Sequence, residues 1–274
     1  MHHSILYWLP FFLLVILPIG IRPILAQIAP DPLPGANPGR PTVSTPATLT
    51  PVGYLQFENG VLGAYTSPEF STRFAINQVT KLAVAARLQA IVISEPFIKS
   101  RFDLDKETHP GEVFAGVQAV LLPGEKRRPT ISMSYIRRLH ASPAPELDLG
   151  TYHQGGVFLA STDVQGFHVD ANAIFNEQIE TNRSGSRVRR AQFGQTLSVS
   201  HPWKRWTLGG ELWHFTQPFT NSNAAGSLWA AAYTVRPNLV IDGGFQHGLT
   251  DTSTRWEVFA GFTYVLPYRL WKQH

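Results

Sequence analysis

The sequence predicts an all-β fold in which about twelve antiparallel strands close into an up-and-down transmembrane β-barrel. Three observations support this prediction: apolar and polar residues alternate along most of the chain, the alternating segments are long, and short connections alternate with long ones. The composition agrees, because only 15% of the residues are charged and 12% are aromatic, whereas a disordered chain is rich in charge and poor in aromatic rings. The sequence contains no cysteine, which excludes disulfide scaffolds and thiolate chemistry.

The first element is an apolar segment typical of an export signal. Residues 5–21 are nearly all apolar, but the run is short for a membrane-spanning helix and is interrupted by proline and glycine. Because the small residue Ala26 follows it, we expect residues 1–26 to be a signal peptide that is cleaved after Ala26. Two histidines stand near the start where lysine or arginine is usual, so an uncleaved anchor helix is the alternative.

Residues 27–52 form a leader rich in proline, alanine, glycine and threonine. This composition predicts an extended segment without a core of its own. Its shortage of large apolar residues slightly favours a leader that hangs in the periplasm over one that plugs the barrel. The barrel is expected to span residues 53–266, followed by a C-terminal tail of residues 267–274.

Alternation with a period of two is clearest over residues 166–176. One face carries the apolar residues Phe167, Val169, Ala171, Ala173 and Phe175. The other face carries His168, Asp170, Asn172 and Asn176, with Ile174 as the exception. The same pattern recurs over residues 81–92, 113–121, 239–246 and 254–265. A period of two indicates strands with one apolar face.

The predicted strands are long. Most of the roughly twelve segments contain about nine to fourteen residues, whereas strands of globular proteins average about five or six. A tilted strand needs about nine to eleven residues to cross a bilayer, so their length favours a membrane barrel. The segments start near Tyr54, Glu69, Lys81, Gly111, Thr130, His153, Gln165, Arg190, Arg205, Ala225, Asn238 and Thr254.

The connections between these segments alternate in length. Tight turns are expected at residues 77–80, 161–164, 201–204 and 236–237, with a slightly longer one at 123–129. Longer and more polar loops are expected at residues 94–110, 140–152, 180–189, 217–224 and 248–253. Short turns at one end and long loops at the other are typical of an outer-membrane barrel with both termini in the periplasm.

Aromatic residues lie near several strand ends on the apolar face, as they do in the interfacial girdles of a membrane barrel. They are Trp206, Trp229, Tyr233, Trp256 and Tyr264. An exported β-sandwich that binds a ligand is the alternative fold. Such a sandwich would aim Val169, Leu239 and Val258 at one another in a core, and it would stay soluble without detergent.

Short motifs at both ends of the predicted barrel resemble a known family. They are Arg40-Pro41, Pro51-Val52-Gly53, the first strand Leu55-Gln56-Phe57-Glu58 and the last strand over residues 259–265. On these motifs, residues 40–265 resemble the outer-membrane barrel family named for the meta-pathway of phenol degradation. The resemblance implies a transporter-like barrel that takes up hydrophobic or aromatic small molecules. The chain departs from the family at Gly39 and Thr42, where members commonly have Asp, and in continuing beyond the last strand.

Charged residues on the polar face are the candidate lining of the lumen. Glu58 and Arg73 lie on neighbouring predicted strands, and Asp242 neighbours the strand of Arg255 and Glu257. Opposite charges that face one another are expected to pair and brace the wall, and a charged constriction that filters solutes is the functional alternative. The candidates are Glu58, Arg73, Arg87, Asp170, Glu211, Asp242, Arg255 and Glu257.

No catalytic, cofactor-binding or metal site is predicted. His168 and Asp170 share a strand face, but a metal site needs at least one further ligand, so ordinary lumen polarity is the preferred interpretation. A basic loop is able to bind lipopolysaccharide phosphates, although a solvated loop is the preferred interpretation there too. Its arginines are Arg183, Arg187, Arg189 and Arg190.

We therefore expect a monomeric, non-enzymatic outer-membrane barrel through which small, hydrophobic or aromatic solutes pass by passive or facilitated diffusion. The expected partners are outer-membrane lipid, the solute and the barrel-insertion machinery, with no cofactor. Nucleic acid is not expected, because the net charge of +4 is modest and the basic residues are scattered. A lipid-modifying enzyme of the outer membrane is the alternative, although the sequence has no Gly-x-Ser-x-Gly nucleophile elbow.

Overall fold

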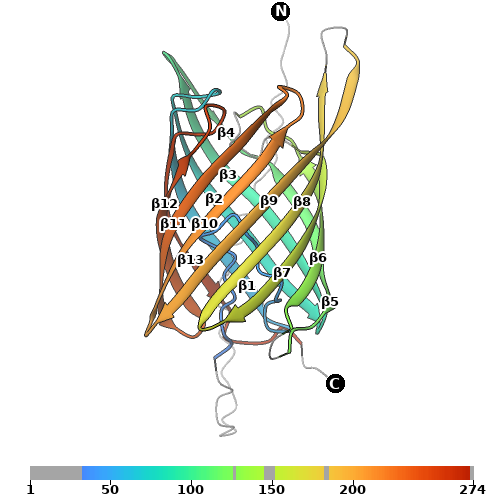
Figure 1. Ribbon diagram of the computed structural model, residues 1–274, viewed down its shortest axis with the longest axis vertical. Coiled ribbons are helices and arrows are strands. Elements are labelled where there is room, and N and C mark those ends of the chain that lie inside the picture. The colour runs from blue at the N-terminus through green and yellow to red at the C-terminus, as the bar shows by residue number, and fades with distance from the viewer. Residues whose placement is uncertain (1–32, 126–127, 145–151, 182–184, 272–274) are drawn as a thin grey trace, which may run out of the picture. The chain divides into compact units, whose positions relative to one another are not determined.

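The computed structural model describes residues 33–125, 128–144, 152–181 and 185–271, which form a closed antiparallel β-barrel (Figure 1). The predicted signal peptide, residues 1–26, and leader residues 27–32 lie outside the described residues. The strands are β1 Leu55–Tyr65, β2 Thr72–Ala85, β3 Leu88–Phe102, β4 Asp105–His109, β5 Val113–Leu122, β6 Thr130–His140, β7 Gln154–Val164, β8 Phe167–Thr181, β9 Arg187–Trp203, β10 Trp206–Gln217, β11 Ser222–Arg236, β12 Leu239–Gly248 and β13 Trp256–Val265.

The wall closes because β1 pairs with both β2 and β13, and every other wall strand also has an antiparallel neighbour on each side. Twelve of the thirteen strands form this wall. The remaining strand, β4, pairs with the end of β3 over Ile98–Phe102 and continues the sheet beyond β5 at the long-loop end. The predicted closed barrel of about twelve strands is confirmed, and the β-sandwich alternative is excluded.

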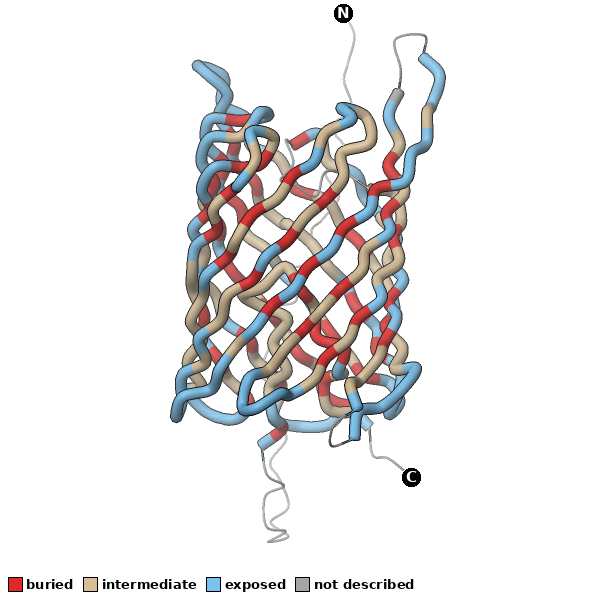
Figure 2. The backbone as a smooth tube through the Cα atoms, in the orientation of Figure 1, coloured by how far each residue is buried: buried red, intermediate tan, exposed pale blue. Residues whose placement is uncertain are grey.

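The barrel has an apolar outer face and a polar inner face. Along β9, Gln192, Thr196 and Ser198 are buried toward the lumen, whereas the intervening Phe193 and Leu197 are exposed on the outside. Figure 2 shows the same alternation of buried and exposed residues along strand after strand. Val258 is exposed on the outer face, so it does not take part in a central apolar core. Large outward apolar side chains are what a lipid-facing wall requires, because water would leave them unfavourably exposed.

The predicted segmentation is wrong at the second and third strands. β2 runs without a break through residues 77–80, which were expected to form a turn, and the actual turn is Ala86-Arg87. β3 then continues to Phe102, although residues 94–102 were expected to belong to a loop. Polar residues such as Asn77 are tolerated in the middle of a strand that borders a polar lumen, so polarity is a poor turn signal in this fold.

The turn between β7 and β8 also lies later than predicted. β7 extends to Val164, and the connection is Gln165-Gly166, whose φ angles are 51° and 85°. Two successive residues with positive φ define the two-residue hairpin turn that matches the twist of antiparallel strands, and glycine adopts the second position without steric cost.

The residues that follow β13 bond to the first residue of β1 and to the segment just before it. The amide of Leu266 donates to the carbonyl of Leu55 at 2.9 Å, and the amide of Leu270 donates to the carbonyl of Gly53 at 2.8 Å. No helix in the described ranges has the length and apolar character needed to cross a membrane.

We expect Leu212→Arg to destabilise the barrel in a lipid bilayer by about 2–4 kcal/mol, which is the cost of arginine at the bilayer midplane. Leu212 points outward near the middle of β10. The measurement is denaturant unfolding of vesicle-reconstituted protein, with Leu212→Met as the apolar control. An arginine variant as stable as the methionine variant would show that this face does not contact acyl chains.

Candidate functional site

The leader passes through the lumen instead of hanging outside it. Between residues 37 and 50, its backbone forms hydrogen bonds with inward-facing side chains of several wall strands. In Figure 1 this segment is the blue coil enclosed by the strands. The slight preference for a periplasmic leader is therefore wrong for these residues.

Glu211 of β10 provides the strongest attachment of the leader. Its two carboxylate oxygens accept hydrogen bonds from the backbone amides of Val43 at 2.8 Å and Ser44 at 2.7 Å, and the Ser44 hydroxyl adds a further bond at 2.7 Å. Val43 also packs against the buried rings of Trp213 and Phe215, which face the lumen from the same strand. Bonds to a charged acceptor are stronger than neutral ones, so this contact fixes the leader against β10.

Other wall side chains bind the leader backbone in the same way. They are Gln56 with Asn37 at 2.9 Å, Glu58 with Gly39 at 3.2 Å, Asn172 with Thr45 at 2.7 Å, Ser161 with Ala47 at 2.7 Å and Gln89 with Thr50 at 2.9 Å. An extended segment has no internal partners for its amides, and buried amides must be paired. The polar lumen supplies those partners from strands on several sides of the barrel.

Arg40 attaches the leader to the wall through an ion pair and through close packing against two glycines. Its Nη2 lies 3.3 Å from Oδ1 of Asp242 on β12. The guanidinium packs against Gly60 and Gly261, which face each other across β1 and β13. A Cβ at Gly60 would lie 2.3 Å from Arg40 Nη2, and one at Gly261 would lie 2.8 Å from Arg40 Nε. The glycine pair therefore makes the room that the arginine occupies.

Among the residues that the structure describes, two cavities border the leader, one toward each end of the lumen. One of about 410 Å³ lies mainly against β2, β3, β5, β6 and β7 on the long-loop side. The other, of about 350 Å³, lies against β8 to β12 and reaches residues next to the short turns. Arg40 and Thr42 line both cavities, so this part of the leader is the partition between them.

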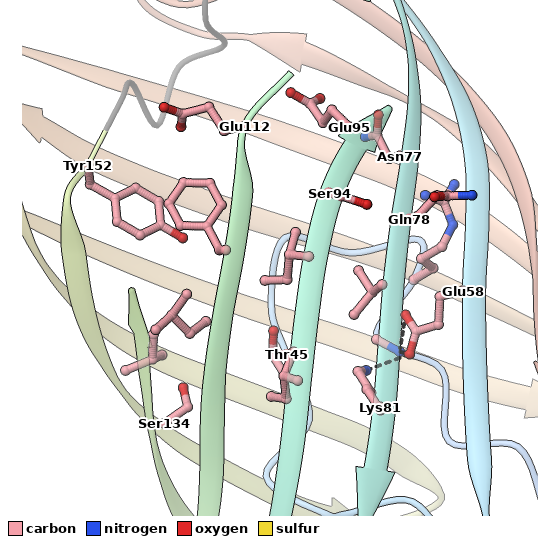
Figure 3. A pocket seen from close by; sticks show the side chains of 18 of the residues that line it. Thr45, Glu58, Asn77, Gln78, Lys81, Ser94, Glu95, Glu112, Ser134 and Tyr152 are labelled. Carbon is pink, nitrogen blue, oxygen red and sulfur yellow. Dashed lines mark hydrogen bonds and ion pairs between the residues drawn. The ribbon is translucent and has the colours of Figure 1, made fainter. Parts of the chain in front are cut away.

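The cavity on the long-loop side is amphipathic (Figure 3). Its apolar lining includes Val79, Ile91, Ile93, Phe114, Ile136 and Val157. Its polar groups include the ion pair of Lys81 and Glu58, whose Nζ and Oε1 are 2.5 Å apart. The side-chain oxygen of Asn77 is buried and has no hydrogen-bond partner among the described residues, so it offers an acceptor to a solute. This surface suits a small molecule with an apolar body and a polar group.

Tyr152 borders the same cavity from the loop that precedes β7. Its ring stacks on Phe114 with 4.6 Å between the ring centroids. Burial, and to a lesser extent the negative charge of Glu112, raises the pKa of the Tyr152 hydroxyl above its ordinary value of 10.0. The hydroxyl therefore stays protonated at neutral pH.

The structure places most of the predicted charges on the lumen side and two of them elsewhere. The residues buried on the lumen side are Glu58, Arg73, Asp170, Glu211, Asp242 and Glu257. Arg87 lies exposed in the turn between β2 and β3, and Arg255 lies exposed directly before β13. These two positions are strand ends, where the alternation of faces no longer dictates the direction of a side chain.

The predicted ion pairs are replaced by others. Strand register places Glu58 opposite Val79 and Arg73 opposite Ala64, so these two charges are not cross-strand partners. Glu58 pairs with Lys81, and Arg73 pairs with Glu95 at 2.9 Å. Likewise, Asp242 lies opposite Gly261 rather than either predicted partner, and it binds Arg40 of the leader.

Several charged residues of the lumen were not among the candidates. Arg138 and Glu112 form an ion pair of 2.7 Å near the long-loop end, and Lys81 and Glu95 complete the pairs described above. Lys81 alternates with apolar neighbours in the sequence, which is the signal that would have found it. Glu112 alternates with the apolar residues at the start of the segment 113–121, so the same signal would have found it. Glu95 fell within the misplaced loop, so no such signal was available for it.

His168 lies near the short-turn end of β8. Its Nδ1 is 2.8 Å from Asp163 Oδ1, and its Nε2 is 3.3 Å from Asp170 Oδ1. Both imidazole nitrogens thus face carboxylates. No group of three or more potential metal ligands that could hold an ion occurs among the residues that the structure describes.

Comparison with solved structures identifies the fold. The chain is similar to the NanC porin, with 10% sequence identity over 76% of this chain and 100% of that one and a TM-score of 0.55. It is also similar to an outer membrane channel from Pseudomonas putida, with 12% identity over 80% of this chain and 98% of that one and a TM-score of 0.60. These two similarities show that the chain has the fold of outer-membrane barrels. No protein-family description and no curated protein matches the sequence.

We expect Glu211→Ala to loosen the leader within the lumen, because the leader then loses three bonds to a charged acceptor, each worth about 1.5–3 kcal/mol. The chain has no native cysteine, so Ala47→Cys, at a fully buried leader position, reports accessibility through its rate of maleimide labelling. Labelling of Ala47→Cys combined with Glu211→Ala should be at least about tenfold faster than labelling of Ala47→Cys alone. As a control, Glu95→Ala removes a lumen carboxylate that pairs with Arg73 of β2, and it should leave the rate unchanged.

Proposed function

We propose that this protein is an outer-membrane channel through which small solutes diffuse, and that the leader narrows its lumen. The observation that carries this proposal is the pair of cavities at opposite ends of the lumen, separated by Arg40 and Thr42. A displacement of this partition would join them into a path from the long loops to the short turns. The leader is held by polar contacts, and polar contacts exchange with water more readily than a packed apolar core does.

The solute class is small molecules with a hydrophobic or aromatic body and a polar group. The apolar side chains in the cavity on the long-loop side support this class, because they would contact the body of the solute. Asn77, Tyr152 and the nearby ion pairs supply hydrogen-bonding groups for its polar part. The pairs of opposite charge would also favour solutes of modest net charge over strongly charged ones.

The proposal includes location in the outer membrane after export with residues 1–26 as a cleaved signal peptide. It also includes assembly as a monomer by the barrel-insertion machinery, and contact with outer-membrane lipid. The apolar outer wall supports the membrane location, and the similarity to a porin and to an outer membrane channel supports both location and fold. A lipid-modifying activity is not favoured by any arrangement found in the described residues, and a lipid hydrolysis assay on the reconstituted protein tests it.

We expect the full chain to release benzoate from vesicles faster than glucuronate, because the cavity lining favours an aromatic body. Val157→Trp should slow benzoate release, since this residue lines the cavity. Phe158→Trp is the matched control, because the adjacent side chain points outward. Release equal to that of protein-free vesicles would contradict a channel, and equal release by both variants would contradict this cavity as the route.

Deletion of residues 34–50 should raise single-channel conductance severalfold in planar bilayers, since it removes the partition from the lumen. Heat-modifiable migration on a gel checks that the shortened chain still forms a barrel. An unchanged conductance in a correctly folded deletion variant would show that the leader does not limit passage.

A further inference from the structure

A hollow of about 450 Å³ opens on the outer wall across β6, β7, β8 and β9, toward the long-loop end. Strand register places Tyr135, Gly156 and Phe175 in one row around the outside of the barrel. The glycine between the two aromatic rings has no side chain, so it forms the floor of a slot whose walls are the rings. A Cβ at Gly156 would meet only the carbonyl oxygen of Ser134, at 3.8 Å.

The side of this slot nearer the long loops is closed by a chain of polar contacts. The Tyr135 hydroxyl donates to Gln154 Oε1 at 2.7 Å, and Gln154 Nε2 donates to Glu177 Oε2 at 3.0 Å. Arg189 Nη1 then donates to Glu177 Oε1 at 3.0 Å. These contacts hold the polar residues in a fixed row directly above the aromatic walls.

Positive charge exceeds negative charge along this row. Arg137 lies opposite Gln154 in the register of β6 and β7, and its side chain is exposed on the outer face. Arg189 lies on the far side of Glu177, also exposed. Two other arginines of the basic loop noted in the sequence do not belong to this row. Arg190 donates to the carbonyl of Pro218 and stacks over the ring of Phe219. Arg183 lies outside the described residues.

An apolar surface continues from the slot toward the middle of the wall. The rings of Phe158 and Phe175 meet edge to face with centroids 6.3 Å apart, and those of Phe175 and Phe193 with centroids 5.4 Å apart. All three rings are exposed on the outside. A cationic row above a grooved apolar surface matches a lipid with a phosphate above its acyl chains.

We propose that this slot binds a phosphorylated, multiply acylated glycolipid of the outer leaflet. One acyl chain lies over Gly156 between Tyr135 and Phe175, and the phosphate groups lie at Arg137 and at Arg189, on either side of the Glu177 carboxylate, where guanidinium groups offer bidentate donors. The site rests on the proposed outer-membrane location, in which the long loops face outward and this row lies at the level of the outer-leaflet head groups. That level is what favours a glycolipid of the outer leaflet over a phospholipid of the inner one.

The test is titration of delipidated protein in detergent with bisphosphorylated lipid A, followed by native mass spectrometry. Arg137→Ala combined with Arg189→Ala should weaken binding at least about tenfold, through the loss of the phosphate contacts. Gly156→Leu should also weaken it, because the new side chain fills the slot. The matched controls are Gly63→Leu on the outer face of β1, and Arg205→Ala combined with Arg236→Ala at the short-turn end, both of which should bind as the parent does.

Equal affinity in the parent and in both slot variants would overturn the proposal, and so would equal loss in the control variants. Phosphatidylglycerol is titrated in parallel, and binding as tight as that of lipid A would overturn the assignment to the glycolipid. Inorganic phosphate should not bind at the same concentrations. Benzoate release is measured in vesicles that contain no glycolipid, where all variants should match the parent. A failed channel function is thereby distinguished from a failed lipid site.

Discussion

The structure depends on the closure of one hydrogen-bonded sheet. Because β1 pairs with β13 as well as with β2, each of the twelve wall strands has a neighbour on both sides, and the wall has no open edge. With the backbone paired in this way, apolar side chains can face outward and polar side chains inward, which is the opposite of the arrangement in a soluble protein. Residues such as Phe193 and Leu197 face outward, while Gln192 and Thr196 face inward.

A polar interior creates a second requirement, which the leader meets. Buried carboxylates and amides need partners, and the narrow lumen of a barrel of this size can be filled by protein groups. The leader amides donate to Glu211, Asn172 and Gln89, so wall and leader satisfy each other. The leader therefore determines how much of the lumen remains open, and its contacts are polar enough to be exchanged for water.

The sequence predicted the wall better than the contents of the lumen. Alternation over β8 identified both faces, including Ile174, whose inward direction is explained by its packing near Trp213 and Phe215. The turn expected at residues 77–80 was wrong, because polar residues inside a lumen resemble a turn. The position of the leader could not be predicted, since its attachment uses backbone amides, and amides leave no pattern in the identity of the residues that carry them.

The claim on which the account rests is that lipid touches one face of the wall and not the other. Two of the seven tryptophans report on it directly: Trp229 is 57% exposed on the outside, and Trp213 is 3% exposed on the lumen side. The measurement is fluorescence quenching by brominated acyl chains, in variants that keep one of these tryptophans and replace the others with phenylalanine. Strong quenching of Trp229 with little quenching of Trp213 is the predicted result. Equal quenching of both, or quenching of Trp213 alone, would contradict it.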